Sequence, residues 1–255
     1  LSRGLELTLN TTLFDNEDFY WNINANGSLQ DLEITKLNLS GDENFFIPQG
    51  GISGGVGNTI QLLKPGYDPS TFFVFRQVYD ANGNPIQGAY VDVNGDNQIT
   101  EEDRQPYKKA TPDAFVGLTS NTRYKNLSLS FTFRGSFGNY VYNNVNSSTG
   151  TLRHILGAPG NFYQNGSVDA LRTMFTDDQY FSDYYIRRAD FVKLDNLAIS
   201  YDFPFDRVKL TASAIFTNLL IITDYEGIDP EISNGIDNNF YPRPRGFTFG
   251  LNFTY

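Results

Sequence analysis

Residues 92–103 read DVNGDNQITEED and gather side-chain oxygens that could bind a metal ion. The run matches the calcium-loop pattern D-x-[DN]-x-[DN], in which alternate side chains on a tightly curled backbone surround one ion. Calcium takes about six to eight oxygen ligands, which this spacing supplies. The predicted ligands are the side chains of Asp92, Asn94, Asp96 and Asp103 and the backbone carbonyl of Gln98.

Two positions of this run depart from the calcium-loop pattern. Asn97 stands where the pattern has glycine, which is tolerable because asparagine adopts left-handed backbone conformations most readily after glycine. Asp103 stands where the pattern has glutamate, and its shorter side chain would weaken binding. Ile99 is expected to anchor the loop to its support. The alternative is an acidic turn that is only solvated.

A second short match concerns catalysis. Residues 51–55, GISGG, fit the nucleophile pattern G-x-S-x-G, with Ser53 as the nucleophile. That pattern requires a strand before the serine and a helix after it, and no helical pattern follows here. His154 is the single histidine, so it would have to be the base, and a multi-histidine zinc site is excluded. We expect the chain not to be an enzyme.

Composition restricts the class of protein. The net charge is −10, which argues against nucleic-acid binding, because neutralising phosphates requires clustered lysine and arginine. The absence of cysteine excludes disulfides and thiolate metal sites. Mean hydropathy is slightly negative, and no apolar run approaches the roughly 18–20 residues of a membrane helix. Membrane strands remain possible, since they alternate apolar and polar residues.

The elements that must position these residues are predicted strands, because apolar residues recur with period two. One predicted strand places Leu5, Leu7, Leu9 and Leu13 on one face, and the last one ends in the alternating run GFTFGLNFTY. The opposite faces carry serine, threonine and asparagine rather than lysine and glutamate. Outer-membrane barrels have such strands, apolar outside and polar inside, of about 10 residues. A soluble β-sandwich or β-helix is the alternative.

Nine strands are predicted, and the connections between them alternate in length. The strands cover about 3–14, 18–29, 57–66, 70–80, 113–122, 124–138, 188–203, 206–222 and 244–255. Short turns are predicted at 15–18, 64–69, 121–126 and 202–207, and long loops at about 30–56, 80–112, 139–187 and 223–243. This asymmetry is typical of the periplasmic and extracellular ends of an outer-membrane barrel. Single-chain bacterial barrels have even strand numbers, so nine strands should not close a barrel alone.

Several stretches together resemble SusC/RagA-like TonB-dependent transporters. They are YVDVNGDNQITEEDR, TPDAFVGLTSNTRYKNLSLSFTFRGSFGN, YYIRRADFVKLDNLAISYDFP, YEGIDPE and YPRPRGFTFGLNFTY, and they span nearly the whole chain. The terminal aromatic strand, ending in Tyr255, is similar to the signal read by the outer-membrane assembly machinery. The resemblance implies an all-β fold, an antiparallel transmembrane β-barrel of 22 strands, of which residues 1–255 would be the C-terminal part.

The resemblance also implies a function and partners. Such proteins lie in the bacterial outer membrane and import oligosaccharides or peptides, using energy relayed by TonB. A SusD-like surface lipoprotein closes the barrel as a lid. The sequence shows no plug domain, TonB box or signal peptide, so coupling to the TonB complex is expected through a preceding region.

Two other classes of protein stay open at the level of sequence. One is a non-transporting outer-membrane barrel, such as an adhesin or a porin. The other is a soluble, calcium-stabilised β-protein that carries a dockerin-like loop.

Overall fold

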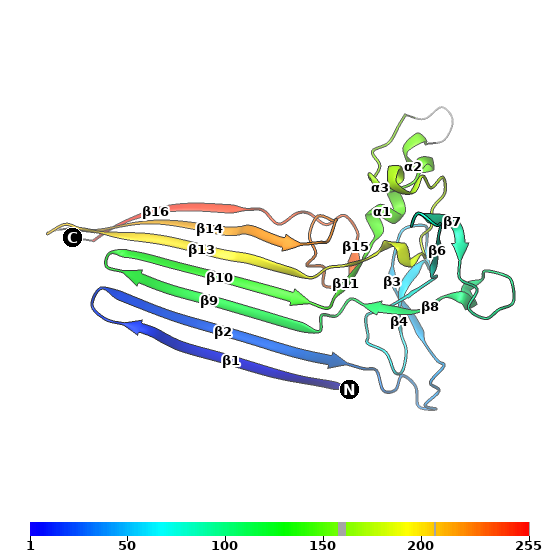
Figure 1. Cartoon of the computed structure of the whole chain (residues 1–255), viewed down its shortest axis with the longest axis horizontal. Helices are drawn as coiled ribbons and strands as arrows, with labels where there is room; N and C mark the ends of the chain where they lie inside the picture. The colour runs from blue at the N-terminus through cyan, green and yellow to red at the C-terminus, as the bar shows by residue number, and fades with distance from the viewer. Residues whose placement is uncertain (158–161, 207, 255) are drawn as a thin grey trace.

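The computed structural model of the chain describes residues 1–157, 162–206 and 208–254. Its largest element is one antiparallel sheet of seven strands in the order β1-β2-β9-β10-β13-β14-β16, here called the wall sheet (Figure 1). The strands are β1 (Ser2–Asp15), β2 (Phe19–Leu32), β9 (Ala114–Tyr124), β10 (Leu127–Phe137), β13 (Phe191–Pro204), β14 (Lys209–Thr223) and β16 (Gly246–Thr254). The predicted antiparallel β-fold is confirmed.

The register of the wall sheet separates its two faces. Directly paired residues of antiparallel strands lie on the same face, so a row of partners can be followed across the sheet. One such row is Leu9, Ala25, Leu118, Phe133, Leu194 and Leu220. The neighbouring row is Asn10, Asn24, Thr119, Thr132, Asn196 and Thr217. The first row belongs to an apolar face and the second to a polar face, as the period-two pattern predicts.

A bulge corrects one detail of the predicted pattern. The pairing of β1 with β2 shifts between Thr12 and Phe14, which leaves Leu13 as the extra residue. Phe14 therefore stands opposite Trp21, and their rings stack with centroids 6.1 Å apart. Leu13 was expected to continue the apolar row, but Phe14 does so, because an inserted residue exchanges the two faces of the strand.

The two ends of the wall sheet differ, as expected from the loop lengths. The connections from β1 to β2, from β9 to β10 and from β13 to β14 lie at one end, near the C-terminus, and three of the predicted short turns fall there (Figure 1). The described parts of the long connections 33–113, 138–190 and 224–245 all lie at the other end. We call these three connections together the loop module. Residues 158–161, 207 and 255, which fall in a predicted loop and two predicted strands, lie outside the described residues.

The predicted count of nine strands is wrong for this sheet, which has seven among the described residues. The segments predicted at 57–66 and 70–80 are instead short strands of the loop module, and 64–69 is a turn between two of them. Their residues are buried at successive positions rather than at alternate ones. With five residues or fewer, these strands are also shorter than the roughly 9–11 residues of a membrane-crossing strand.

Three small sheets and short helices form the loop module. A four-stranded sheet contains β3 (Ile47–Gly51), β4 (Thr59–Leu63), β5 (Thr71–Val74) and β8 (Gln105–Lys109); a pair contains β6 (Gln77–Tyr79) and β7 (Pro85–Tyr90). A third sheet contains β12 (Ile186–Arg188), β11 (Tyr140–Asn143) and β15 (Ile236–Asp237). The helices are α1 (Asn144–Thr149), α2 (Leu152–Leu156) and α3 (Asp169–Thr173), with 3-10 turns η1 (Glu101–Asp103) and η2 (Asp183–Tyr185).

The hydrophobic core lies in the loop module, not in the wall sheet. Its buried residues come from all three long connections and are Ile60, Phe72, Val74, Ala110, Tyr142, Tyr185, Ile186 and Ile236. Backbone hydrogen bonds join the same connections, for example from Tyr142 N to Gly235 O at 2.8 Å and from Phe75 N to Phe181 O at 2.8 Å. The three loops are therefore one folded unit.

Among the described residues, no helix combines the length and the apolar character needed to cross a membrane.

Candidate functional site

The predicted calcium loop is curled tightly around its first residue. The two carboxylate oxygens of Asp92 accept hydrogen bonds from Gly95 N at 2.6 Å and from Asn97 N at 2.8 Å. Gly95 and Asn97 both have left-handed backbones, with φ of 77° and 63°. Asn97 thus adopts the conformation that the pattern requires of its turn glycine, as predicted.

The middle of the loop is a chain of short-range side-chain contacts. Asp96 N donates to Asn94 Oδ1 at 3.0 Å, and Gln98 N donates to Asp96 Oδ1 at 2.8 Å. Asn94 Nδ2 also donates to Asp96 Oδ2 at 3.2 Å. Side-chain oxygens of Asn94 and Asp96 therefore hold the backbone of the turn.

Asp103 closes the loop, as its place in the pattern predicts. Its side chain is buried, and its two oxygens accept hydrogen bonds from Val93 N and Thr100 N, both at 2.8 Å. The second bond completes a capping box with Thr100 at the start of η1. The hydrogen bonds from Thr100 and Val93 hold the pKa of Asp103 below its usual range. One carboxylate thus joins the first and last parts of the run.

Ile99 does not anchor the loop, contrary to the prediction, because its side chain is 42% exposed. The anchor is Arg104, the next residue after η1. Its Nη2 donates to Thr59 O at 2.6 Å and to Phe73 O at 2.7 Å. Its guanidinium also lies over the rings of Phe73 and Phe181, at 4.6 and 4.4 Å from their centroids. Burial among these groups lowers the pKa of Arg104 to about 10.

The donor set of the loop has the chemistry that calcium prefers, namely carboxylate and amide oxygens. In residues 1–157, 162–206 and 208–254, however, no group of three or more His, Cys, Asp or Glu side chains lies close enough to hold a metal ion. Instead, oxygens of Asp92, Asn94, Asp96 and Asp103 accept backbone N–H groups. The loop therefore keeps its curled shape by hydrogen bonds of its own.

The serine and histidine of the nucleophile pattern belong to different local structures. Ser53 lies in a turn after β3, and its Oγ accepts a hydrogen bond from Asn144 Nδ2 at 3.2 Å. His154 lies in α2, and its Nε2 is 3.2 Å from Asn165 O. The side chains of Ser53 and His154 thus bind other residues, and neither hydrogen bond joins the serine to the histidine.

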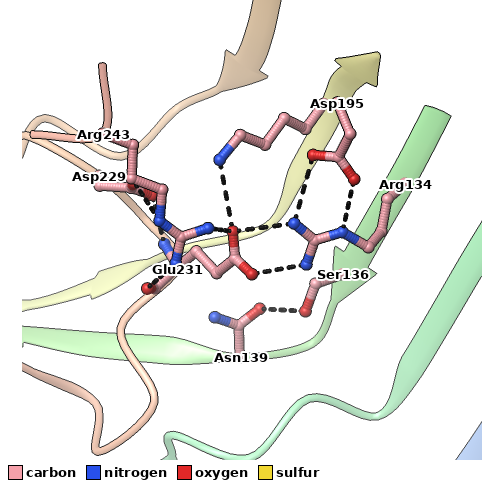
Figure 2. A network of polar contacts seen from close by, with 8 residues as sticks. Arg134, Ser136, Asn139, Asp195, Asp229, Glu231 and Arg243 are labelled. Carbon is pink, nitrogen blue, oxygen red and sulfur yellow. Dashed lines mark hydrogen bonds and ion pairs between the residues drawn. The ribbon is translucent and has the colours of Figure 1, made fainter. Parts of the chain in front are cut away.

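A charged cluster on the polar face of the wall sheet was not predicted from the sequence. Arg134, on β10, binds Asp195 on β13 through Nε at 2.8 Å and through Nη2 at 3.3 Å (Figure 2). The same guanidinium binds Glu231 through Nη1 at 2.5 Å and through Nη2 at 3.1 Å. Glu231 belongs to the last connection of the loop module, so Arg134 joins that connection to two wall strands.

Two further cations contact Glu231. Arg243 Nη1 donates to its carboxylate (Figure 2). Lys193 Nζ lies 3.4 Å from Oε2. Arg243 also pairs with Asp229 at 3.4 Å. Burial raises the pKa of Glu231, but the hydrogen bonds and charge of Arg134 and the charges of Arg243 and Lys193 outweigh it, so the pKa lies below the usual range. The sequence signals were Arg134 and Lys193, two charges that stand directly opposite each other on the polar faces of β10 and β13.

Away from this cluster, hydroxyl and amide groups dominate the polar face. Asn22 Nδ2 donates to Asn10 Oδ1 at 3.0 Å, and Ser130 Oγ donates to Asn121 Oδ1 at 2.7 Å. Such neutral groups can form hydrogen bonds with water or with a polar solute. The wall sheet therefore has one polar face that can form hydrogen bonds and one apolar face.

Known proteins are similar to this chain in sequence and in fold. The TonB-dependent receptor SusC of Bacteroides thetaiotaomicron is 36% identical over 99% of this chain and 26% of its own length. The TonB-dependent receptor P3 of Formosa agariphila is 26% identical over the whole chain and 28% of its own length. The chain thus spans about a quarter of the length of these relatives. No protein-family model matches it.

Solved structures agree on the fold. The RagAB peptide transporter matches 98% of this chain and 29% of its own chain, with a TM-score of 0.72 and 23% identity. The RagAB peptide importer in its open-open state matches the whole chain and 28% of its own, with a TM-score of 0.70 and 22% identity. The wall sheet accordingly has the fold of a portion of such a transporter's β-barrel. The chain is therefore SusC/RagA-like: 99% of it aligns with a TonB-dependent receptor, and receptors of this kind lie in the bacterial outer membrane.

Proposed function

We propose that this chain forms part of the barrel wall and of the outer loops of a TonB-dependent importer for oligosaccharides or peptides. The observation that carries the proposal is the wall sheet, which has one mainly apolar face and one polar face, where hydroxyl and amide groups surround the cluster at Arg134. An apolar face of this extent matches lipid on the outside of a barrel, and the polar face matches a water-filled interior. The polar face would line the path of the cargo.

The folded loop module supports a partner at the outer surface. A loop module with its own core offers a stable docking platform, unlike a set of separate mobile loops. We propose that a SusD-like lipoprotein docks there as a lid, and that the TonB complex acts through the remainder of the receptor. The relatives support this reading, since they include TonB-dependent receptors and a peptide importer.

Uptake by cells that carry the full-length receptor tests this function. Labelled oligosaccharides and peptides are offered to cells with and without TonB, and with and without the lipoprotein. Energised import predicts uptake that is lost when TonB is deleted. Uptake that is independent of TonB would identify a porin, and surface binding without uptake would identify an adhesin. A full-length protein that stays monomeric in buffer without detergent would exclude the barrel.

We also propose that the loop at 92–103 binds calcium and that the bound ion stabilises the loop module. The residues that would hold the ion are Asp92, Asn94, Asp96, Gln98 and Asp103, and the divalent ion would offset two of the three negative charges of the aspartates. The left-handed conformations of Gly95 and Asn97 support the proposal, because they give the curled backbone that such loops need.

The double substitution Asp92→Ala with Asp96→Ala tests the calcium proposal. We expect loss of bound calcium and faster proteolysis of the loop, while the barrel still assembles. Glu101→Ala with Glu102→Ala is the control, because it removes the same charge from the same loop outside the ligand set. Unchanged calcium content and protease resistance in the first variant would contradict the proposal.

A further inference from the structure

Two cations of the wall sheet stand directly opposite each other on its polar face. Arg134 on β10 pairs with Lys193 on β13 in the antiparallel register. Like charges in such a position destabilise a sheet unless anions lie beside them. Asp195, the extra residue of a bulge in β13, binds one edge of the Arg134 guanidinium. Lys193 and the other edge of Arg134 still require a counter-ion.

The need for this counter-ion is greatest at Lys193, because its side chain is only 4% exposed. A buried ammonium that has no partner costs free energy, since it has lost its hydration. Among the described residues, Glu231 provides the one carboxylate within 4.0 Å of Lys193 Nζ. The buried charge of Lys193 is therefore compensated only while the last connection of the loop module places Glu231 beside it.

The Glu231 carboxylate is also contacted by two guanidinium groups. Arg134 donates to it from Nη1 and Nη2, and Arg243, from the same connection as Glu231, donates to it from Nη1. Figure 2 shows the carboxylate between these two arginines. Cations from β10, β13 and residues 224–245 thus converge on one carboxylate, which is how proteins bind an anion by charged hydrogen bonds. Here the anion belongs to the chain itself.

A cavity of about 390 Å³ adjoins this carboxylate. Its lining includes Glu231 and, from the wall sheet, Arg134, Ser136, Phe115 and Phe191. Ser136 is two residues from Arg134 and pairs with both phenylalanines, so these four side chains belong to the polar face. Small-molecule sites are commonly about 300–1,000 Å³ and combine apolar surface with a few polar groups. The cavity has room for the carbon skeleton of a small acid whose carboxylate takes the place of Glu231.

Glu231 lies in a segment whose two ends are held in the loop module. Tyr225, before it, is buried, and its hydroxyl donates to Asp237 at 2.8 Å. Ile236, after it, belongs to the core of the loop module. Movement of the residues between these two points is therefore enough to withdraw Glu231 from the cations, and the core stays intact.

We propose that Arg134, Lys193 and Arg243 form a binding site for the carboxylate of a small organic acid, and that Glu231 occupies this site as a built-in competitor. The proposal rests on the importer function given above only in that the polar face must meet water. Glu231 in place excludes dissolved carboxylates. When Glu231 withdraws, the three cations keep two carboxylate partners, so one positive charge is left for the acid.

Binding of acetate to the purified full-length receptor with Glu231→Ala tests the site, because this substitution removes the built-in carboxylate and leaves space for a dissolved one. Hydrogen exchange of residues 224–245 is the readout, since bound acetate again joins Arg243 to the wall sheet. We expect saturating acetate to slow this exchange about tenfold, the ratio that corresponds to about one charged hydrogen bond. We expect no slowing in the unmodified receptor. Unchanged exchange in Glu231→Ala, or equal slowing in the unmodified receptor, would overturn the proposal.

Two solutes separate binding from general effects of salt and of small molecules. Chloride at the same ionic strength supplies charge without a carboxylate, and acetamide supplies the same shape without the charge. We expect neither solute to slow the exchange in Glu231→Ala. Slowing by either one to the extent seen with acetate would overturn the carboxylate site.

Glu231→Gln is the matched control, because its side chain still fills the place of the carboxylate. We expect acetate to leave its exchange unchanged, and also that of the double variant Glu231→Ala with Lys193→Met, which lacks the buried ammonium. Slowing in either variant equal to that in Glu231→Ala would overturn the site. If Glu231→Ala does not assemble, Glu231→Ser takes its place. TonB-dependent uptake by the unmodified receptor is measured in parallel, so that a failed site with intact uptake is distinguished from a failed importer function.

Discussion

The wall sheet exposes its apolar side chains, whereas the loop module buries them. Leu7, on the apolar face of the wall sheet, is 72% exposed, whereas Phe72, in the core of the loop module, is fully buried. The wall sheet places its apolar side chains outward, and the loop module places them inward. This difference in burial matches the medium around each region, which is lipid on the apolar face of the wall sheet and water around the loop module.

The largest expected effect concerns the core of the loop module. Phe72→Ala should lower the free energy of unfolding of that module by about 3–5 kcal/mol, because it leaves a cavity among close-packed side chains. Hydrogen exchange of the module in the full-length receptor measures this. The control is Leu39→Ala in the same long connection, where the side chain is 99% exposed and the effect should be below about 0.5 kcal/mol. Equal losses in the two variants would break the comparison.

A charge on the apolar face should affect assembly rather than the loop module. Phe249, in the middle of β16, is 76% exposed, and Phe249→Lys should cost about 2–4 kcal/mol if that position faces the bilayer centre. Thr248→Lys places the same charge on the polar face and should be tolerated. Unfolding of the receptor from vesicles in denaturant measures both. Indistinguishable variants would show that the apolar face does not meet lipid.

The contact between the two regions depends on Glu231. Glu231→Gln should weaken the attachment of residues 224–245 to the wall sheet by about 2 kcal/mol, because charged hydrogen bonds to Arg134 and Arg243 are lost. Limited proteolysis of that connection reports the change. Glu226→Gln is the control, since Glu226 pairs with Arg172 where both side chains are about half exposed. Similar proteolysis rates in the two variants would argue against a specific attachment.

The smallest expected effect is a dependence of the same attachment on pH. The folded pKa of Glu231 lies below its ordinary value of 4.5, so the ionised form stabilises the attachment. The contribution is fully present above pH 4.5 and is lost as the pH falls further, through the folded pKa. Hydrogen exchange of residues 224–245 between neutral and acidic pH measures it. A pH dependence that persists in Glu231→Gln would assign the effect to another group.

Local patterns predicted the wall sheet well and the loop module poorly. Strands such as β10 and β13 repeat a period-two pattern over many residues, and a pattern that long determines both the element and its faces. The segments around β4 and β5 carry similar β-forming residues, but they are too short to reveal their period. They were therefore assigned to the wrong sheet.

The candidate sites divide in the same way. The curled loop at 92–103 was predictable, since its contacts run between residues only a few positions apart. The cluster around Glu231 was not predictable, because its shortest hydrogen bond to the wall sheet joins Glu231 to Arg134, almost 100 positions away in the sequence. Arg104 likewise binds carbonyls of Thr59 and Phe73, and nothing in its local sequence identifies them.

The sequence by itself determined that this chain has antiparallel strands with one apolar face and one polar face, short turns at one end and long loops at the other. These features are set by alternation and turn composition within single segments. Only the tertiary structure decided that the three long loops share a core, that Arg104 binds carbonyls of Thr59 and Phe73, and that Glu231 binds the wall sheet. Such contacts depend on which distant segments meet, and burial and charge pairing settle that only when the whole chain folds.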